Sequence, residues 1–460
     1  MYLNHIDIRN FRCFKKYSVD FSPRITILYG LNGAGKTTLI HAIHKALSFV
    51  MATDTSGDKK VRHTIAGGNT KLKVENFSAN GDFFLMEDEK DIDPVMEVGA
   101  MASLEGGTSI EWSISAYTNK GKARPSAYMP AFKKFYEQYE QTDKLPVLAY
   151  YSDGFPHVED KRVVSEKMAS LRSMGYYDWN NEEACSKIWL ERLEWKMRFV
   201  ERTERRLKEY DKYSHIENAS IVISNQEMYD KELKELNEVK HELEAINNCF
   251  KCFSLGDAYI EVEALELGAF DDQLSLRTTQ KKVFSFRNLP AGYKRMYYML
   301  LDIAYRSYIL NRTVDAEGIV MIDEIDLHLH PGLEKVILQR FAKVFPHLQF
   351  IVSTHSPLVI TSVETEKTGN KIYCMTPNQT EPFLLSDVYG LDYNTSIEDV
   401  MHVEAGNEEL EQKVALCAYM MREGLLDQAR NLMENILLKY GISQERLERM
   451  VAKCKEEMGA

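Results

Sequence analysis

The residues with the clearest chemistry lie in Gly30-Leu31-Asn32-Gly33-Ala34-Gly35-Lys36-Thr37-Thr38. This segment matches G-x-x-x-x-G-K-[ST], the pattern of a phosphate-binding loop. Its glycines let the backbone wrap a phosphate, and the N–H groups at the start of a helix favour an anion. We therefore expect a bound nucleoside triphosphate, with Lys36 reaching the β- and γ-phosphates and the Thr37 hydroxyl ligating Mg²⁺. The other expected contacts of the loop are Asn32, Gly33, Ala34, Gly35 and Thr38.

Two carboxylates follow a later apolar run, Gly318–Ile322. Such a run is typical of a parallel strand buried on both faces, and ligands gather at the carboxyl ends of these strands. Asp323 would hold Mg²⁺, directly or through water, and Glu324 would polarise the water that attacks the γ-phosphate. A strand with a merely acidic exit is the alternative. The intact phosphate loop about 290 residues earlier favours the catalytic interpretation.

A histidine closes the next predicted strand, in Ser353-Thr354-His355-Ser356-Pro357. At this position the His355 ring can sense the γ-phosphate through a hydrogen bond. A satisfied structural histidine is the alternative. The place of His355, directly after the strand that follows Asp323 and Glu324, favours a functional role.

The elements that must position these residues have the pattern of an α/β protein. Arg24–Tyr29 is a predicted buried strand, and Leu39–Leu47 has helical spacing of apolar residues. Tyr2–Phe21 predicts an antiparallel hairpin broken near Arg9–Arg12. A β-rich layer is predicted from Thr70–Asn76, Asp82–Met86 and Ser109–Ala116, and further elements from Leu145–Tyr151, Tyr259–Leu265, Gln280–Phe286, Gln349–Ser353 and the helix Tyr293–Asn311.

Two other regions are helical. Glu191–Tyr213 and Asn225–Ile246 carry apolar residues at helical spacing among charges of both signs, which predicts an antiparallel arm. A solvated face and a surface that contacts DNA or a partner both remain open for this arm. The tail predicts a three-helix packing or assembly unit, with helices Glu408–Glu423, Leu426–Tyr440 and Ser443–Glu457.

Composition narrows the class of protein. The 460 residues, 44% of them hydrophobic, can bury a large core with two or three domains. A net charge of −12 argues against a uniformly basic coat for nucleic acid. One close cysteine pair, Cys249 and Cys252, lacks the second pair of a zinc site, so reduced thiols are expected. No apolar run approaches the length of a membrane span, and we expect a soluble cytoplasmic protein.

Four segments together resemble the ABC-type ATPases of the SMC/RecF/OLD group. They are Gly30–Thr38, Leu289-Pro290-Ala291-Gly292-Tyr293, Asp323–Pro331 and Ser353–Pro357. The resemblance implies ATP and Mg²⁺ as ligands and a P-loop ATPase head, in which a mixed sheet has a β-rich subdomain. It also implies head-to-head dimers, in which the signature loop of one subunit caps the γ-phosphate held by the other. The domains expected on this basis are 1–160 and 256–390 for the two halves of the head, 161–255 for a helical insertion and 391–460 for the helical tail.

One position departs from the family pattern. The second position of the signature usually offers a serine hydroxyl, but here it is Pro290, which has neither hydroxyl nor backbone N–H. The trans contact must then depend on the Gly292 N–H and the helix start at Tyr293. This favours a slow, switch-like ATPase in which bound nucleotide holds one assembly state. The glutamine loop of such sites is not identifiable in the sequence.

Within the group, this chain resembles the head-only ATPase subunits of bacterial anti-phage systems, which are of similar length. The resemblance is to the PtuA type of Septu systems and its retron-associated relatives, with the PARIS type second. It depends on the segment 289–295, the short helical insertion and the helical tail. It implies an oligomeric ATPase that regulates a separate nuclease, of HNH type or alternatively of Toprim type. We expect no nuclease domain in this chain, because the tail is too short for a Toprim domain and His328-Leu329-His330 lacks the context of an HNH site.

Two rival functions remain open. A RecF-like DNA-repair ATPase would bind DNA directly, and the acidic total charge disfavours it. A nucleotide-dependent scaffold with almost no hydrolysis would also be compatible with Pro290. The cations best suited to DNA are Lys133, Lys134, Lys196, Arg198, Arg202, Arg205 and Arg206.

Overall fold

The computed structural model describes residues 1–55, 63–65, 72–78, 81–83, 95–117, 122–155, 171–179, 186–213, 219–268, 273–395, 400, 408–440 and 442–457. Two compact units make up the chain, Met1–Tyr389 and Gly390–Ala460. Within the described ranges, no helix combines the length and the apolar character needed to cross a bilayer. The domain boundary expected at residue 160 lies outside the described residues, and the finer division of the first unit stays a prediction.

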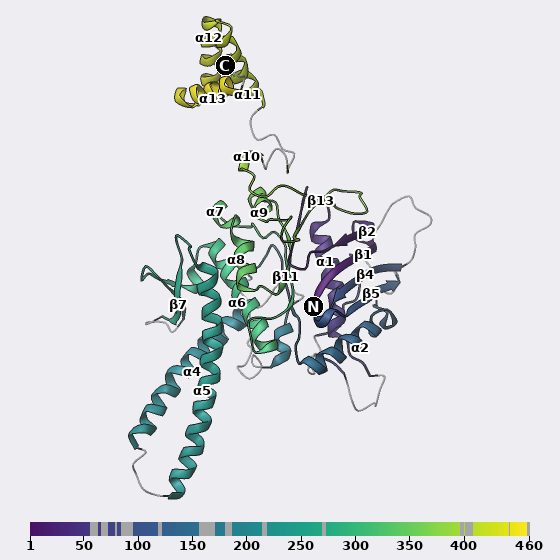
Figure 1. The fold of residues 1–460 in the computed structure, drawn as a ribbon, viewed down its shortest axis with the longest axis vertical. Helices are drawn as coiled ribbons and strands as arrows, with labels where there is room; N and C mark the ends of the chain where they lie inside the picture. The colour runs from purple at the N-terminus through teal and green to yellow at the C-terminus, as the bar shows by residue number, and fades with distance from the viewer. Residues whose placement is uncertain are drawn as a thin grey trace. The chain divides into compact units, whose positions relative to one another are not determined.

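A six-stranded sheet forms the centre of the first unit (Figure 1). Its strand order is β13-β12-β3-β11-β10-β6, and five neighbouring strands run parallel while β13 is antiparallel. Strands β6, β10 and β11 are buried along their whole length, as expected when both faces of a parallel sheet are covered. The bounds are β3 (Ile25–Gly30), β6 (Val147–Tyr151), β10 (Gly318–Ile322), β11 (Leu348–Ser353), β12 (Lys371–Met375) and β13 (Phe383–Leu385). This confirms the predicted α/β class.

A four-stranded antiparallel sheet, β2-β1-β4-β5, forms the β-rich part of the first unit. The hairpin of β1 (Tyr2–Phe11) and β2 (Phe14–Asp20) was predicted and is confirmed. Helix α1 (Lys36–Leu47) contacts strands of both sheets. The strand β5 (Ser109–Tyr117) was predicted, whereas β4 (Val95–Ser103) and the helix α2 (Pro125–Thr142) were not.

Two predicted strands of this layer are wrong in their described parts. Residues 72–76 of the first form no strand, because side chains of α1 and the following turn take the hydrogen bonds of this backbone instead. In the second, Asp82–Met86, only Phe83 forms an isolated bridge, to Phe11. Residues 70–71 and 84–86 lie outside the described residues.

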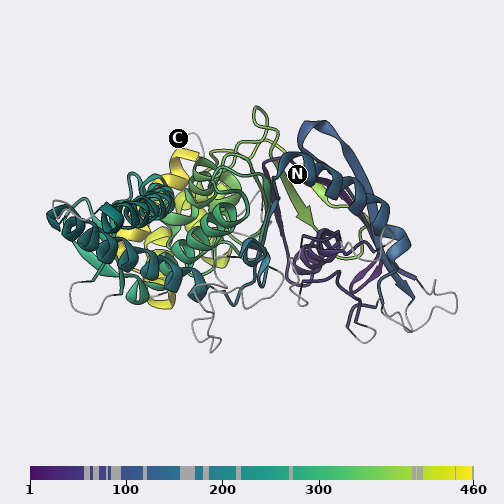
Figure 2. The same ribbon diagram turned by 90° about the horizontal axis from the view of Figure 1, so that it is seen from below.

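Helix α1 packs on one face of the six-stranded sheet, and further helices cover the opposite face (Figure 2). The longest central one is α6 (Ala291–Asn311), which is buried from Arg295 to Leu310. The turns η3 (Arg172–Tyr176) and η4 (Phe286–Asn288) contact α6. The other short elements of this unit are α7 (Pro331–Glu334), α8 (Ile337–Val344), α9 (Pro357–Thr361), η1 (Ser48–Met51) after α1 and η2 (Glu105–Gly107) between β4 and β5. A small sheet of β7 (Val262–Leu267), β8 (Leu274–Thr278) and β9 (Val283–Ser285) adjoins η4, and of these strands β8 was not predicted.

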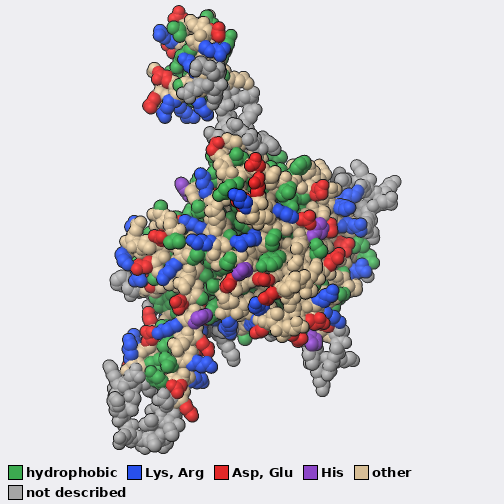
Figure 3. All heavy atoms as spheres, in the orientation of Figure 1, with side chains coloured by type: hydrophobic (Ala, Val, Ile, Leu, Met, Phe, Trp, Pro, Cys, Tyr) green, Lys and Arg blue, Asp and Glu red, His purple; other side chains and the backbone are tan. Residues whose placement is uncertain are grey.

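The helical arm consists of α4 (Ser186–Tyr213) and α5 (Ala219–Ser254), which run side by side in Figure 1. Both are longer than predicted. A buried bidentate pair joins them, in which Arg192 Nε and Nη2 each donate to Glu242 over 2.8 Å. Figure 3 shows cations and acids intermixed along the arm rather than a face of one sign. The face of the arm seen in this view therefore has mixed charge, as is typical of a solvated face.

The second unit contains the three helices predicted for the tail. They are α11 (Glu408–Arg422), α12 (Leu426–Tyr440) and α13 (Gln444–Glu457), preceded by the single turn α10 (Tyr393–Thr395). Their apolar faces share one core, which includes Val414, Cys417, Ile436 and Leu447.

Candidate nucleotide-binding site

The predicted site residues follow three neighbouring parallel strands. The backbone register pairs Leu28 of β3 with Ser353 of β11, and Val352 of β11 with Ile322 of β10. The segments that come after β3, β10 and β11 therefore leave the sheet at the same edge. Ligands of open α/β sheets bind at this carboxyl edge.

The phosphate loop is shaped by glycine backbone conformations. Gly30, Gly33 and Gly35 have φ values of 144°, 81° and 94°, which side-chain-bearing residues rarely adopt. A Cβ at Gly30 would lie 2.1 Å from the Met375 carbonyl oxygen, and one at Gly35 would lie 2.5 Å from the Phe14 ring. Space as well as conformation thus requires glycine at these two positions.

Lys36 begins α1 and points back over the loop. Its ammonium group donates to the carbonyl oxygens of Gly30, at 2.8 Å, and Leu31, at 3.1 Å. Burial lowers the pKa of this ammonium, while the carboxylates of Asp323, Glu324 and Asp326 oppose that shift. These carboxylates act on Lys36 because the phosphate loop and the acidic turn leave the same sheet edge. Among the other predicted loop contacts, Ala34 is buried and Thr38 half-buried, whereas the exposed ones are Asn32, Gly33 and Thr37.

The acidic turn is held by a serine of the adjacent strand. The Ser353 hydroxyl donates to Asp323 Oδ1 and accepts the Glu324 N–H at 2.8 Å. The Asp323 N–H in turn donates to the Tyr151 carbonyl at 2.8 Å. Glu324 has a φ of 50°, which costs free energy for a residue with a side chain and is often found at functional sites. Asp323 is 4% exposed and Glu324 is half-buried, so the second carboxylate is the more accessible.

The histidine segment is tied to the same turn through Asp326. Thr354 Oγ1 donates to Asp326 Oδ1 at 2.5 Å, and the His355 N–H donates to the same oxygen at 3.3 Å. His355 is half-buried, and Ser356 then caps α9 by accepting the Leu358 N–H at 3.1 Å. Asp326 and Thr354 lie within the motifs recognised in the sequence, but no role was predicted for them. Their position after adjacent strands was the available signal.

Gly292 lies at the start of α6, in the predicted signature. It is buried, and a Cβ there would lie 2.6 Å from the His328 carbonyl oxygen. The other near atoms belong to His328 and Leu329, so Gly292 packs on the end of the acidic turn of its own chain. The structure thus brings Gly292 to the turn after β10 and not to the phosphate loop of the same chain.

Sequence reasoning did not single out Arg295, one turn further along α6. Its side chain is 1% exposed and donates to five backbone carbonyls. Two of these belong to Asp323 and Glu324. Burying an arginine costs free energy unless its N–H groups have acceptors. The sequence pattern did not show that Arg295 would be buried.

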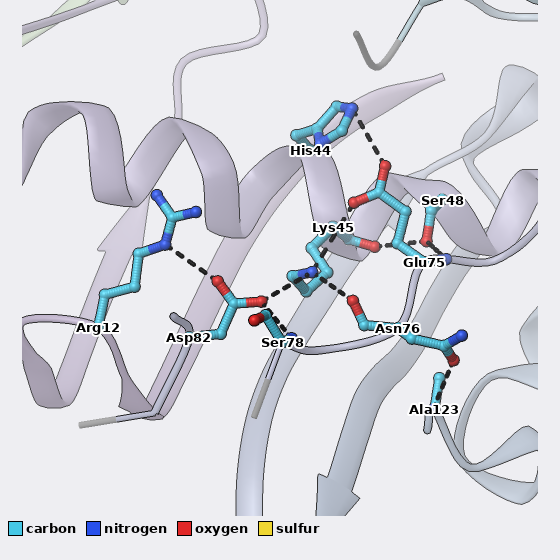
Figure 4. A network of polar contacts seen from close by, with 9 residues as sticks. All are labelled: Arg12, His44, Lys45, Ser48, Glu75, Asn76, Ser78, Asp82 and Ala123. Atoms are coloured by element: carbon cyan, nitrogen blue, oxygen red, sulfur yellow. Dashed lines mark hydrogen bonds and ion pairs between the residues drawn. The ribbon is translucent and has the colours of Figure 1, made fainter. Parts of the chain in front are cut away.

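A polar network supports the phosphate-loop helix from behind (Figure 4). Lys45, near the end of α1, donates to the Asn76 carbonyl at 2.7 Å and lies 3.3 Å from Asp82 and 3.8 Å from Glu75. Arg12, in the β1–β2 turn, reaches the other oxygen of Asp82 at 3.1 Å. The network therefore ties the described parts of 72–83 to both α1 and the first hairpin.

One of the two histidines after the acidic turn has a capping role. His330 caps α7, with Nδ1 accepting the Gly332 N–H at 3.2 Å. Throughout the described ranges, no group of three or more His, Cys, Asp and Glu side chains has the arrangement of a metal site. A Mg²⁺ bound with a triphosphate needs fewer protein ligands, and the Thr37 hydroxyl and the Asp323 carboxylate are the hard oxygen donors that it prefers.

Comparisons with known proteins agree with this architecture. The model of the AAA domain family matches residues 5–251, and a second model, described as "AAA domain, putative AbiEii toxin, Type IV TA system", matches residues 212–361. The chain is 25% identical over 414 residues to the "Retron Vc95 probable ATPase" of Vibrio cholerae serotype O1 biovar El Tor, covering 79% of this chain and 72% of that protein. It is 37% identical over 121 residues to the Septu protein PtuA of Bacillus mycoides, covering 24% of this chain and 17% of that protein.

The SMC head domain from Pyrococcus furiosus, crystallised with an extended coiled coil and bound to the C-terminal domain of ScpA, aligns with a TM-score of 0.42 and 15% identity. The alignment covers 87% of this chain and 98% of that structure. The predicted resemblance to this group of ATPases, including the retron and Septu proteins, is confirmed by the matched relatives and models. Because the first model covers more than half of the 460 residues, the chain belongs to the AAA domain family.

Proposed function

We propose that this chain binds and slowly hydrolyses ATP as the ATPase subunit of a bacterial anti-phage defence complex. In this complex it would oligomerise and regulate a partner nuclease. The observation that supports the ATPase part is the parallel pairing of β3, β11 and β10, because it makes the phosphate loop and the segment of Asp323, Glu324 and Asp326 leave the same sheet edge. The retron and Septu relatives support the defence part.

We assign the following roles to the residues of the site. The backbone of Gly33–Thr38 and the Lys36 ammonium bind the phosphates, and Thr37 and Asp323 hold Mg²⁺, which neutralises charge on the phosphate oxygens. Glu324 accepts a proton from the attacking water, for which its accessible carboxylate is suited. His355 contacts the γ-phosphate.

Slow turnover follows from the signature loop. Pro290 provides no hydroxyl and no N–H to a γ-phosphate in trans, so the contact would depend on the backbone N–H groups at the start of α6. In the proposed head-to-head dimer, the Gly292 N–H of one subunit contacts the nucleotide of the other. The heads would then stay engaged while ATP is bound and separate after hydrolysis.

Measuring ATP binding and hydrolysis tests the first part of the proposal. Wild type should bind Mg·ATP and release phosphate, whereas Lys36→Ala should lose affinity by about 100-fold, because it loses the cation that contacts the phosphates. Phosphate release that survives in Lys36→Ala would point to a contaminating enzyme. Binding without release in wild type would favour the scaffold function.

The partner part needs the neighbouring gene product. The chain should be purified together with it, and DNA cleavage measured over a range of ATP concentrations. We expect cleavage to change with ATP occupancy, with an HNH-type nuclease as the first expectation and a Toprim-type nuclease as the second. Cleavage that is flat over the range would rule out regulation by ATP.

Direct DNA binding of the RecF kind gains no support from the cations of the arm or from Lys133 on α2. Ion pairs neutralise several of the cations proposed for it, over 3.4 Å, 3.4 Å and 3.2 Å in Lys133–Asp54, Arg198–Glu194 and Arg206–Glu232. We therefore expect the isolated chain to give at most a weak gel shift. A strong shift that weakens steeply with salt would favour the DNA-repair function instead.

A further inference from the structure

Arg295 is a buried cation whose hydrogen-bond acceptors differ from those of the other fully buried arginines. The other fully buried arginines pair with carboxylates: Arg306 Nε donates to Asp302 at 2.6 Å, and Arg192 pairs with Glu242. Among the described residues, Arg295 contacts no carboxylate. Its acceptors are backbone carbonyls, and their positions show which segments of the chain the guanidinium connects.

These carbonyls belong to two turns that follow neighbouring strands. Nη1 donates to Asp153 at 2.9 Å and to Phe155 at 2.8 Å, in the turn after β6. Nη2 donates to Asp323 at 3.0 Å and to Glu324 at 3.2 Å, in the turn after β10, and also to Ser152 at 3.2 Å. The planar fork of the guanidinium therefore bridges the two turns, which a single ammonium group cannot do.

The contact with Glu324 fixes a strained peptide. Glu324 has a left-handed φ of 50°, and its N–H is held by Ser353 Oγ at 2.8 Å. Arg295 holds the carbonyl of the same residue. The same carbonyl also accepts the Leu327 N–H at 3.1 Å within the turn. Ser353 and Arg295 therefore add contacts from outside the turn to both backbone groups of Glu324, which helps the residue to stay in an unfavourable conformation. The direction of the Glu324 carboxylate depends on this conformation.

Arg295 also connects this turn to the signature. It lies one helical turn after Gly292, whose Cα packs on the carbonyl of His328. The start of α6 therefore touches the turn after β10 at Glu324 and again at His328. A displacement of α6 would move both contacts together.

We propose that Arg295 is a positioning residue for hydrolysis, which holds the Glu324 backbone in its left-handed conformation and links the orientation of the Glu324 carboxylate to the position of the signature helix. The proposal rests on the proposed ATPase function and adds to it a link between nucleotide-dependent head engagement and the general base. Ground-state nucleotide binding, which depends on the phosphate loop, does not require it.

The test compares Arg295→Lys with Arg306→Lys in the full-length chain. Arg295→Lys keeps the charge but loses the bridge, so kcat should fall by about 10- to 100-fold while KM and ATP affinity change less than about threefold. Arg306→Lys is matched in helix, burial and substitution. It should lower Tm by a similar amount and leave kcat within about twofold of wild type.

A double substitution distinguishes positioning from general damage. If Arg295 acts through Glu324, adding Arg295→Lys to Glu324→Gln should lower the single-turnover rate by less than about twofold further. Multiplication of the two effects would mean that Arg295 only supports the fold, and would overturn the proposal. An unchanged kcat in Arg295→Lys would overturn it as well and leave the ATPase function standing.

Asp153→Ala covers the case in which Arg295→Lys does not fold. The exposed Asp153 side chain accepts the Gly154 N–H at 2.8 Å and so shapes the turn that Arg295 grips. Its removal should lower kcat by about three- to tenfold without unfolding the protein, and an unchanged kcat would refute the proposal. Wild type without Glu324-dependent hydrolysis would refute both this proposal and the ATPase function, which separates that failure from the others.

Discussion

The phosphate loop and the acidic turn after β10 leave the same sheet edge, but they are built in different ways. The loop depends on glycine conformations and on backbone space, as at Gly30 and Gly35. The acidic turn has ordinary side chains, one of them at a left-handed φ, and is held by hydrogen bonds from Ser353 and Arg295. Substitutions in the loop should therefore damage structure and nucleotide binding together, whereas substitutions of the residues that hold the Glu324 backbone should lower kcat more than nucleotide affinity.

Removing the proposed general base should have the largest effect. Glu324→Gln keeps the shape of the side chain but cannot accept the proton of the attacking water, so kcat should fall by about 100- to 1,000-fold. ATP affinity should stay within about threefold of wild type. Phosphate release and binding of a fluorescent ATP analogue measure the two quantities. An unchanged kcat would mean that Glu324 is only an acidic exit of β10.

Two glycines of the loop provide a matched pair for the structural half of the comparison. Both have positive φ, but a Cβ at Gly35 meets the Phe14 ring, while one at Gly33 meets nothing within 4 Å. We expect Gly33→Ala to lower the free energy of unfolding by about 1 kcal/mol and Gly35→Ala by roughly 3 kcal/mol. Urea unfolding measures both. Equal losses would show that the space around Gly35 is not a constraint.

The pH dependence of stability tests the packing behind the loop. Burial, with the nearby charges of Arg12 and His44, lowers the pKa of His41 on α1 to about 4, and Asp82 opposes the shift only in part. Since the unfolded pKa is about 6.5, this group contributes stability that is full above pH 6.5 and is lost as the pH falls toward 4.

Between pH 7.5 and pH 5, the free energy of unfolding of wild type should therefore fall by roughly 2 kcal/mol more than that of His41→Phe. The buried His44, whose pKa is also lowered by burial, remains in both proteins and provides a common background. Parallel pH curves for the two proteins would contradict the burial of His41.

Ser353→Ala should have the smallest effect of the series. It removes the hydrogen bonds to the Asp323 carboxylate and the Glu324 N–H, so kcat should fall by about tenfold with little loss of stability. Ser307→Ala is the control, because the buried Ser307 hydroxyl donates to the Ile303 carbonyl of its own helix and has no other hydrogen bond among the described residues. A similar change in kcat for both variants would contradict a role of Ser353 in positioning Asp323 and Glu324.

The parts of the site that were predictable are those carried by contiguous motifs. The loop Gly30–Thr38 and the strands before Asp323 and Thr354 have local patterns that determine both their structure and their order along the chain. Parallel pairing of these strands then made the convergence of Lys36 with the carboxylates an expectation rather than a coincidence.

The remaining parts depend on tertiary contacts that leave little local pattern. Arg295 looks like any basic residue of a helix until the turns after β6 and β10 meet around it. Apolar and polar residues alternate in the segment 72–76 as in a strand. Its backbone instead bonds to side chains, because Lys45 donates to the Asn76 carbonyl and the Ser48 hydroxyl accepts the Glu75 N–H. The helix α2 carries Pro125 at its start and Pro130 inside, and these prolines hid its helical spacing.

The most direct test is a crystal structure of Glu324→Gln with ATP and Mg²⁺, since this variant should bind ATP without consuming it. We predict that the triphosphate lies in the loop 30–38 and that the metal is ligated by the Thr37 hydroxyl, with the Asp323 carboxylate bound to it directly or through water. A nucleotide bound elsewhere, or a metal remote from Asp323, would contradict the claim that the two halves form one site.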